Sequence, residues 1–264
     1  MQPLTNIAVK AARRAGGIIL QYYRRGDTGR IESKSENDYV TEADKRAEAD
    51  IIETIHRNHP GHAILAEESG TSGESNTVWI IDPIDGTTNF IHGIPHFCVS
   101  IAVQIDGVVE HAVIYDPVKD ELFTADRGAG ALLDGRRIRA SQQTRLRHAL
   151  LTTGFAYRRG GDIRTHMPTF NRLLSVCGDI RRSGSAALDL AYVAAGRLDG
   201  YWELGLSPWD IAAGKLLVEA AGGIVSDPFG GDPLQSGHIV ASAPKLHPML
   251  EKRVKSTPRG DNPD

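Results

Sequence analysis

Two aspartates at close spacing are the first candidates for chemistry in this sequence. Asp82 and Asp85 lie in Asp-Pro-Ile-Asp-Gly-Thr-Thr-Asn-Phe at residues 82–90, directly after a strand-like apolar run. We expect Pro83 to keep that strand from continuing normally, so that Asp85 turns back beside Asp82. Gly86 and the two threonines after it predict the opening of a helix, whose first N–H groups can receive an anion. The segment therefore predicts two carboxylates beside an anion cradle.

Two carboxylates would repel a phosphate unless a cation lay between them. Carboxylate oxygens are the ligands that Mg²⁺ selects, so a divalent cation resolves the conflict. The alternative is that Asp82 and Asp85 only shape a turn and cap a helix. Such a cap contributes about 1 kcal/mol and needs one carboxylate, whereas this segment has two.

Further acidic residues stand at element ends, and each has an ordinary structural explanation. Glu67 and Glu68 close a predicted strand and could be surface charge. Asp44 follows Thr41 by three residues, which is the spacing of a capping box. Asp210 lies in the first turn of a helix, where the helix dipole favours an acid. Its small, apolar surroundings also predict partial burial, and a buried carboxylate needs a partner.

Composition places the chain among ordinary globular proteins. Of its 264 residues, 41% are hydrophobic and 24% are charged, which excludes a disordered or collagen-like chain. The formal net charge of −3 argues against a protein that coats nucleic acid, and the basic residues at 136–147 are expected on a solvated face. Cys98 and Cys177 are predicted as buried thiols in a reducing compartment. Because residues 6–23 alternate apolar and charged positions at helical spacing, we expect no export or membrane segment, and a cytoplasmic protein.

The order of predicted elements indicates two sheets and several helices. In the first half we expect helices at 6–23 and 41–58, strands at 63–66 and 78–81, a loop at 69–77 and an antiparallel meander over 97–139. Residues 24–38 predict a loop or hairpin. The second half alternates strands and helices: strands at 150–153, 180–182, 198–203, 224–226 and 239–242, and helices at 165–176, 186–195 and 208–221 before a last helix. Residues 256–264 predict a frayed tail.

The motifs together resemble the inositol monophosphatase family of metal-dependent sugar phosphatases. The similarity runs from about residue 6 to 250, and its most specific parts are the segment at 82–90 and Trp-Asp-Ile-Ala-Ala-Gly at 209–214. Glu-Glu-Ser at 67–69 adds to these. The segment at 181–192 looks especially like the bacterial inositol-1-monophosphatase branch. The resemblance implies an α/β protein with a layered α-β-α-β-α fold, an antiparallel sheet in the N-terminal half and a second sheet in the C-terminal half. One catalytic domain would span residues 1–255, with sub-halves of about 1–145 and 146–255.

The resemblance also implies the metal site. Glu67, Asp82 and the carbonyl of Ile84 would hold one Mg²⁺, and Asp82, Asp85 and Asp210 would hold a second. Asp44 matches the position of a third metal and of water orientation. Thr87 would polarise the attacking water together with Asp44, at the metal held by Glu67. No covalent phosphoenzyme is expected, since two metals can generate the nucleophile and stabilise the leaving oxygen in one displacement.

Phosphate and substrate contacts follow from the same resemblance. The backbone N–H groups of Gly86 and Thr87 would receive the phosphate. Substrate hydroxyls would meet a set of residues from four segments: Asp85, Gly184, Ser185, Ala186, Glu203 and Asp210. Taken from the residues alone, Gly184 could serve only a tight turn and Glu203 could be an ordinary strand end. Asp189, an acid in an apolar helix, is expected to pair with an arginine.

Competing functions remain open at this level. The first prediction is a Mg²⁺-dependent inositol 1-phosphate phosphatase, inhibited by Li⁺ and assembled as a homodimer. The second is an interaction protein, because bacterial relatives act as partners of the transcription antitermination machinery and ribosomal RNA synthesis. Intact metal positions favour the enzyme, while Arg181 and Arg182 would suit a docking role. Among enzymes of this type, a histidinol-phosphate phosphatase is the runner-up.

Overall fold

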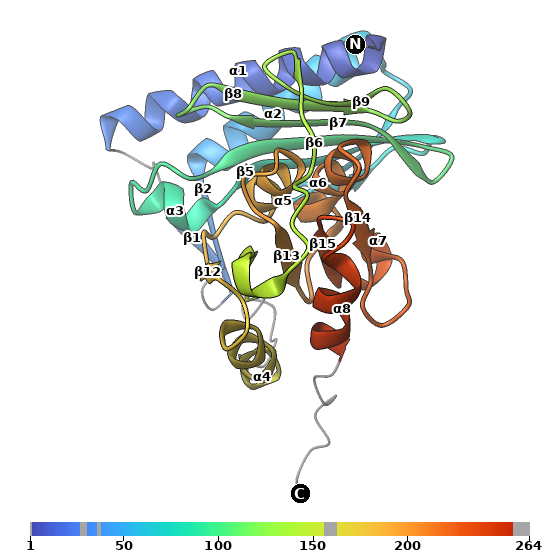
Figure 1. The fold of residues 1–264 in the computed structure, drawn as a ribbon. Coiled ribbons are helices and arrows are strands. Elements are labelled where there is room, and N and C mark those ends of the chain that lie inside the picture. Colours follow the sequence, from blue (N-terminus) through green and yellow to red (C-terminus); the bar gives the residue numbers. More distant parts are fainter. Residues whose placement is uncertain (1, 27–30, 36–37, 156–162, 256–264) are drawn as a thin grey trace, which may run out of the picture.

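Helices and sheets alternate in five layers in the computed structural model, which describes residues 2–26, 31–35, 38–155 and 163–255 (Figure 1). The helices are α1 (Pro3–Arg25), α2 (Glu42–Asn58), α3 (Thr87–Ile91), α4 (Ile163–Leu174), α5 (Ala186–Ala194), α6 (Pro208–Ala220), α7 (Pro233–Ser236) and α8 (His247–Lys255). The strands are β1 (Ile31–Ser35), β2 (Asp38–Thr41), β3 (Ala63–Ala66), β4 (Gly70–Ser72), β5 (Thr77–Asp85), β6 (Cys98–Ile105), β7 (Val108–Asp116), β8 (Glu121–Asp126), β9 (Gly130–Leu133), β10 (Arg136–Arg137), β11 (Leu150–Thr153), β12 (Asp179–Arg181), β13 (Gly200–Glu203), β14 (Ile224–Ser226) and β15 (Ile239–Ser242).

The larger sheet belongs to the N-terminal half. Its eight strands run in the order β10-β9-β8-β7-β6-β5-β3-β4, and every neighbouring pair is antiparallel except β3 with β5. Turns at Asp106-Gly107 and Asp134-Gly135 join β6 to β7 and β9 to β10, and both aspartates adopt the positive φ that such turns require. The predicted antiparallel meander is confirmed.

The smaller sheet belongs to the C-terminal half. It has five strands in the order β12-β11-β13-β15-β14, of which the first three are parallel and the last two pairs are antiparallel. Helices supply the crossovers that parallel neighbours require. The predicted alternation of strands and helices is confirmed, with element ends that differ by one to two residues.

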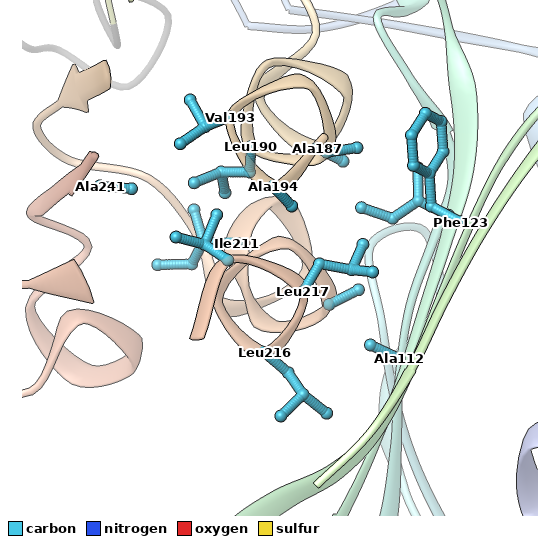
Figure 2. Packing of buried hydrophobic residues seen from close by; sticks show 14 of the residues in the cluster. Ala112, Phe123, Ala187, Leu190, Val193, Ala194, Ile211, Leu216, Leu217 and Ala241 are labelled. Atoms are coloured by element: carbon cyan, nitrogen blue, oxygen red, sulfur yellow. The ribbon is translucent and has the colours of Figure 1, made fainter. Parts of the chain in front are cut away.

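Three apolar clusters hold the layers together. Helices α1 and α2 cover one face of the large sheet through Ala8, Ala11, Ile51 and Ile55, which recur at helical spacing. Helices α5 and α6 fill the space between the two sheets (Figure 2). Helices α4 and α8 cover the outer face of the small sheet. The predicted α-β-α-β-α layering is therefore confirmed.

Strand β5 differs from the prediction at the residue that matters most. It does not end before Pro83 but continues to Asp85, with one extra residue between the pairs Asp82–Ser100 and Asp85–Cys98. Such a bulge tolerates a proline, because the ladder hydrogen bond is already lost there, and it re-aims side chains. Here it brings both aspartates to the same end of the strand.

Other differences are smaller. The predicted loop at 69–77 contains β4, which pairs with β3. Strands β1 and β2 pair as a hairpin that runs past the predicted loop or hairpin at 24–38 to Thr41. Part of the predicted segment lies outside the described residues. Cys98 is buried as expected, but Cys177 is only half-buried. The predicted tail at 256–264 lies outside the described residues.

Candidate active site

One pocket lies where the carboxyl end of β5, the start of α3, the start of α5 and the start of α6 meet. Its lining includes almost every predicted site residue: Glu67, Asp82, Ile84, Asp85, Gly86, Thr87, Gly184, Ser185, Ala186, Glu203 and Asp210. The lining also contains Gly154, Phe155, Arg182, Asp189, Gly205 and Leu206, which the site prediction did not include. We call Glu67, Asp82, Asp85 and Asp210 the carboxylate wall. Gly184, Ser185, Ala186, Asp189 and Glu203 are the α5 wall.

Asp82 lies at the centre of the carboxylate wall. Its Oδ1 accepts the N–H of Ile84 at 3.0 Å, which fixes the side chain over the bulge. Burial raises the pKa of Asp82 well above its usual range, and the negative charges of Glu67, Asp85 and Asp210 raise it further. A side-chain hydrogen bond also links Asp82 to Glu67. Four acids from three separate segments therefore lie close enough to influence one another.

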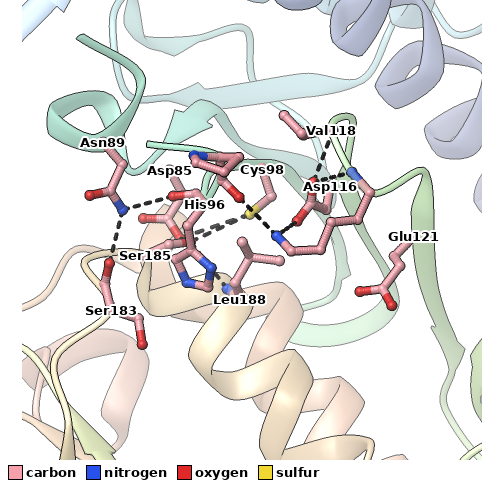
Figure 3. A network of polar contacts seen from close by, with 12 residues as sticks. Asp85, Asn89, His96, Cys98, Asp116, Val118, Glu121, Ser183, Ser185 and Leu188 are labelled. Atoms are coloured by element: carbon pink, nitrogen blue, oxygen red, sulfur yellow. Dashed lines mark hydrogen bonds and ion pairs between the residues drawn. The ribbon is translucent and has the colours of Figure 1, made fainter. Parts of the chain in front are cut away.

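Asp85 connects the two walls (Figure 3). Its Oδ2 accepts the hydroxyl of Ser185 at 2.6 Å and the N–H of Ala187 at 2.7 Å, and the Cys98 thiol lies 3.9 Å away. Burial raises the pKa of Asp85 to about 6, although the bonds from Ser185 and Ala187 lower it. The first turn of α5 thus holds a carboxylate that belongs to the other half of the chain.

Glu67 is positioned by a residue that the sequence analysis did not single out. Glu48 on α2 is buried, and its two carboxylate oxygens accept the N–H groups of Glu68 at 2.9 Å and Ser69 at 2.8 Å. The N–H of Glu67 donates to the carbonyl of Ile81 at 3.1 Å. The sequence did carry a signal for Glu48: it is an acid on the apolar face of an amphipathic helix, and such a position needs a polar partner.

Asp210 and Asp44 both serve as caps, as their sequence positions allow. Asp210 accepts the N–H of Ser207 at 2.7 Å in a capping box at the start of α6, and it lines the pocket. Asp44 accepts the N–H of Thr41 at 2.9 Å in the same arrangement at the start of α2. Asp44 is fully buried but is not among the described residues that line the pocket. Its predicted role in orienting water stays a prediction.

The start of α3 is shaped by Gly86 and Thr87. Gly86 has φ +99°, and a Cβ there would lie 3.0 Å from the carbonyl oxygen of His96, so glycine is required. The hydroxyl of Thr87 donates to the carbonyl of Ile84 at 3.0 Å. This carbonyl is one of the predicted metal ligands, and a carbonyl oxygen has a second lone pair for a further partner.

The α5 wall carries hydrogen-bonding groups of mixed type. Glu203 ends β13, is buried, and accepts the hydroxyl of Tyr201 at 2.7 Å. Gly154 faces it so closely that a Cβ would lie 2.0 Å from Glu203 Oε2, so any larger residue would displace the Glu203 carboxylate. Gly184 has φ +88° and permits the turn that brings Ser185 to Asp85. The ordinary-strand-end interpretation of Glu203 does not account for its burial.

Within the described residues, no arginine pairs with Asp189. Burial raises the pKa of Asp189 well above its usual range, whereas Thr152 on β11 and Ser183 before α5 lower it. Ser183 also joins the halves of the chain, since its carbonyl accepts the side-chain amide of Asn89 at 2.9 Å (Figure 3).

The residues present fit a hard divalent cation by their chemistry. Within the described ranges no three histidine, cysteine or acid side chains already stand at metal-binding spacing. The acids of the carboxylate wall nevertheless lie close together and repel one another. A cation between them would relieve this repulsion. Because all of the side-chain atoms that could ligate the ion are oxygens, these residues suit Mg²⁺ better than zinc or copper.

The structure has a layered α/β fold with an acidic pocket at the junction of its two sheets. Comparisons with known proteins identify the same architecture. The model of the inositol monophosphatase family matches residues 1–259. The chain is 52% identical over 249 residues to "Nus factor SuhB" of Escherichia coli strain K12, covering 93% of each protein.

Solved structures agree with this assignment. The extragenic suppressor protein SuhB of Bartonella henselae superposes with a TM-score of 0.92 at 41% identity, covering 97% of this chain and 99% of that one. The inositol monophosphatase of Anabaena superposes with a TM-score of 0.87 at 43% identity, covering 97% and 96%. The chain belongs to the inositol monophosphatase family, whose members are generally Mg²⁺-dependent. Within the described residues, none of the helices has the length and apolar character that crossing a bilayer requires.

Proposed function

We propose that this chain is a Mg²⁺-dependent phosphatase that hydrolyses inositol 1-phosphate and similar polyol or sugar monophosphates. The observation that carries the proposal is the convergence of Glu67, Asp82, Asp85 and Asp210 in one pocket. Family membership and the likeness to an inositol monophosphatase structure support the reaction class. We place the activity in one catalytic domain over residues 1–255, in a cytoplasmic protein.

Magnesium would be held by the predicted oxygen ligands. Glu67, Asp82 and the carbonyl of Ile84 would hold one ion, Asp82, Asp85 and Asp210 a second, and Asp44 is the predicted ligand of a third. When bound, Mg²⁺ would offset the carboxylate charge that otherwise repels a dianionic phosphate, lower the pKa of water and stabilise the leaving oxygen.

The protein's own groups would orient the reactants. The hydroxyl of Thr87 already donates to the Ile84 carbonyl, so its oxygen lone pairs remain to accept a hydrogen bond that orients the attacking water. Asp44 would share this role. The N–H groups of Gly86 and Thr87 would hold the phosphate for in-line attack, in which the bond from phosphorus to the inositol oxygen breaks and that oxygen takes up a proton.

A covalent phosphoenzyme is not part of the proposal. The Cys98 thiol is fully buried, and burial together with the charge of Asp85 raises its pKa, so it is not a thiolate nucleophile. The hydroxyl of Ser185 donates to Asp85, and the residue is only 2% exposed. Direct attack by water fits the remaining groups.

Phosphate release from inositol 1-phosphate tests the proposal. Purified protein should release phosphate with millimolar Mg²⁺, lose that activity in EDTA and regain it when Mg²⁺ is added back. Glycerol 2-phosphate, histidinol phosphate and fructose 1,6-bisphosphate complete the panel and decide the breadth of specificity. If none of these esters is hydrolysed with Mg²⁺, the proposed function fails.

Two further properties belong to the same proposal. We expect Li⁺ to inhibit the reaction and the protein to form a homodimer in solution. Inhibition curves and light scattering after size-exclusion chromatography measure them directly. A monomer, or activity indifferent to Li⁺, would separate this chain from the expected branch of the family.

A second candidate function is a role in transcription antitermination, without direct contact to nucleic acid. Curated relatives at 50–52% identity carry the name Nus factor SuhB. The exposed Arg181 and Arg182 precede α5 and would suit contact with an acidic partner. Asp85→Asn distinguishes the two candidates. A docking role should survive this substitution in a deletion strain that carries an antitermination reporter, whereas phosphatase activity should not.

A further inference from the structure

Residues 204–207 join β13 to α6, and we call them the α6 linker. Gly205 and Leu206 line the pocket, and Asp210 lines it from the first turn of α6. A hydrogen bond ties the linker to this acid, because the N–H of Ser207 donates to Asp210 Oδ2 at 2.7 Å. Since the linker belongs to no helix or strand, its other N–H groups need partners from elsewhere in the fold.

Those partners come from the turn between α7 and β15. The N–H of Leu206 donates to the carbonyl of Gly237 at 2.9 Å. The N–H of Gly205 donates to Nδ1 of His238 at 3.1 Å. Gly237 has φ +71°, and a Cβ there would lie 2.2 Å from the carbonyl oxygen of Leu206, so the turn packs directly against the linker. Of the two bonds, only the one to His238 comes from a side chain and therefore depends on the residue type.

His238 is itself held in place. Its own N–H donates to the hydroxyl oxygen of Ser236 at 3.1 Å, and its ring packs edge-on against Phe229, with 5.4 Å between the ring centres. A ring nitrogen accepts a hydrogen bond only when it carries no proton, so the bond from Gly205 requires a neutral imidazole with its proton on Nε2. An acceptor fixed by its neighbours in this way can hold the linker in one position.

We propose that His238 is a positioning residue for Asp210, which it keeps in place for a cation by holding the α6 linker. The inference rests on the proposed function, in which Asp210 is a ligand of the second Mg²⁺. His238 is not among the described residues that line the pocket, so its effect passes through the linker. Groups that orient a metal ligand from behind typically account for about 10- to 100-fold in metal affinity.

Cation binding without substrate tests the inference. Calorimetric titration of Mn²⁺ into the full chain, freed of metal with EDTA and dialysed, measures the dissociation constants, and Asp210→Asn identifies the binding step that involves Asp210. In His238→Ala, which removes the acceptor, we expect the dissociation constant of that step to rise about tenfold. His238→Asn offers a side-chain oxygen as acceptor and should keep the constant within about threefold of wild type.

Hydrogen exchange gives a second readout that needs no metal. The amide of Gly205 should exchange faster in His238→Ala than in wild type, because it loses its partner, and His238→Asn should restore the slower rate. Exchange at the same rate in all three proteins would contradict the contact on which the inference depends.

Phe229→Ala is the matched control, because it removes the ring that packs against His238 and leaves the acceptor in place. If His238 only supports the packing of its turn, Phe229→Ala and His238→Asn will weaken Mn²⁺ binding as much as His238→Ala does. That result, or an unchanged dissociation constant in His238→Ala, overturns the inference. If wild type binds Mn²⁺ but hydrolyses none of the phosphate esters, the proposed function fails, while the dissociation constants of the variants still decide the inference.

Discussion

The carboxylate wall and the α5 wall face the same pocket but solve opposite electrostatic problems. In the carboxylate wall, burial raises the pKa of Asp82, and the charges of Glu67, Asp85 and Asp210 raise it further. In the α5 wall, Ser185 and the N–H of Ala187 stabilise the charge of Asp85, and Tyr201 donates to Glu203. The acids of the first wall repel one another, whereas the groups at the second wall donate hydrogen bonds to carboxylates. We therefore propose that the first wall binds the cation and that the second recognises hydroxyls.

Removing a charge from the carboxylate wall should have the largest effect on activity. We expect Asp82→Asn to lower kcat/KM for inositol 1-phosphate by about 100-fold or more, since the lost electrostatic stabilisation amounts to several kcal/mol. Steady-state kinetics over a range of Mg²⁺ concentrations measure this. Asp232→Asn, at the exposed start of α7, is a matched control and should leave activity unchanged. Full activity in Asp82→Asn would remove the carboxylate wall from the mechanism.

Removing the charge of Glu48, which helps to position Glu67, should have a smaller effect on activity. Glu48→Gln removes a carboxylate that accepts two N–H groups in the turn after Glu67. Residues that orient ligands typically account for about 10- to 100-fold in metal affinity, so the Mg²⁺ concentration for half-maximal activity should rise about tenfold. Titration of activity with Mg²⁺ shows this. An unchanged midpoint would mean that the turn holds its shape without Glu48.

The comparison of the two walls also predicts that removing the charge of Asp82 stabilises the protein when no metal is bound. Since the pKa of Asp82 is raised in the folded state, the folded protein loses stability as the pH rises from the unfolded pKa near 4 through the folded one. In EDTA at neutral pH, Asp82→Asn should therefore raise the free energy of unfolding by about 1–2 kcal/mol. Urea unfolding measures it. With saturating Mg²⁺ the order should reverse, and a variant less stable than wild type in EDTA would contradict the charge repulsion.

The smallest effect concerns His96, which lies beside the α5 wall. Burial lowers the pKa of His96 to about 4, and Lys119 lowers it as well, while Asp116 opposes them. The neutral imidazole is favoured by folding, so its contribution is present above pH 6.5 and is lost as the pH falls toward 4. Between pH 7.5 and 5, wild type should lose about 1–2 kcal/mol more than His96→Gln. Parallel urea titrations at both pH values that give equal losses would contradict this.

The sequence predicted the helices and strands for a physical reason. Periodic apolar positions in α1 and α2 and turn residues such as Asp106-Gly107 act locally, so the elements follow from the chain itself. The layering and most of the pocket residues came from the family resemblance. Asp82, Asp85 and Asp210 lie in its most specific motifs, and together with Glu67 they line one pocket.

What sequence reasoning missed depends on contacts between distant segments. The continuation of β5 through Pro83 follows from pairing with β6, which a local rule for proline does not include. Glu48 carried a local signal as an acid on an apolar helix face, but that signal does not name its partner. The partner, the N–H of Glu68, lies 20 residues further along the chain.

The most direct test of the account is to locate the cation. Crystals grown with Mn²⁺ in place of Mg²⁺ should give an anomalous difference peak within coordination distance of the carboxylates of Asp82 and Glu67, and a second between Asp85 and Asp210. Peaks only elsewhere, or none at a concentration that supports phosphate release, would contradict the claim that the carboxylate wall binds the catalytic metal.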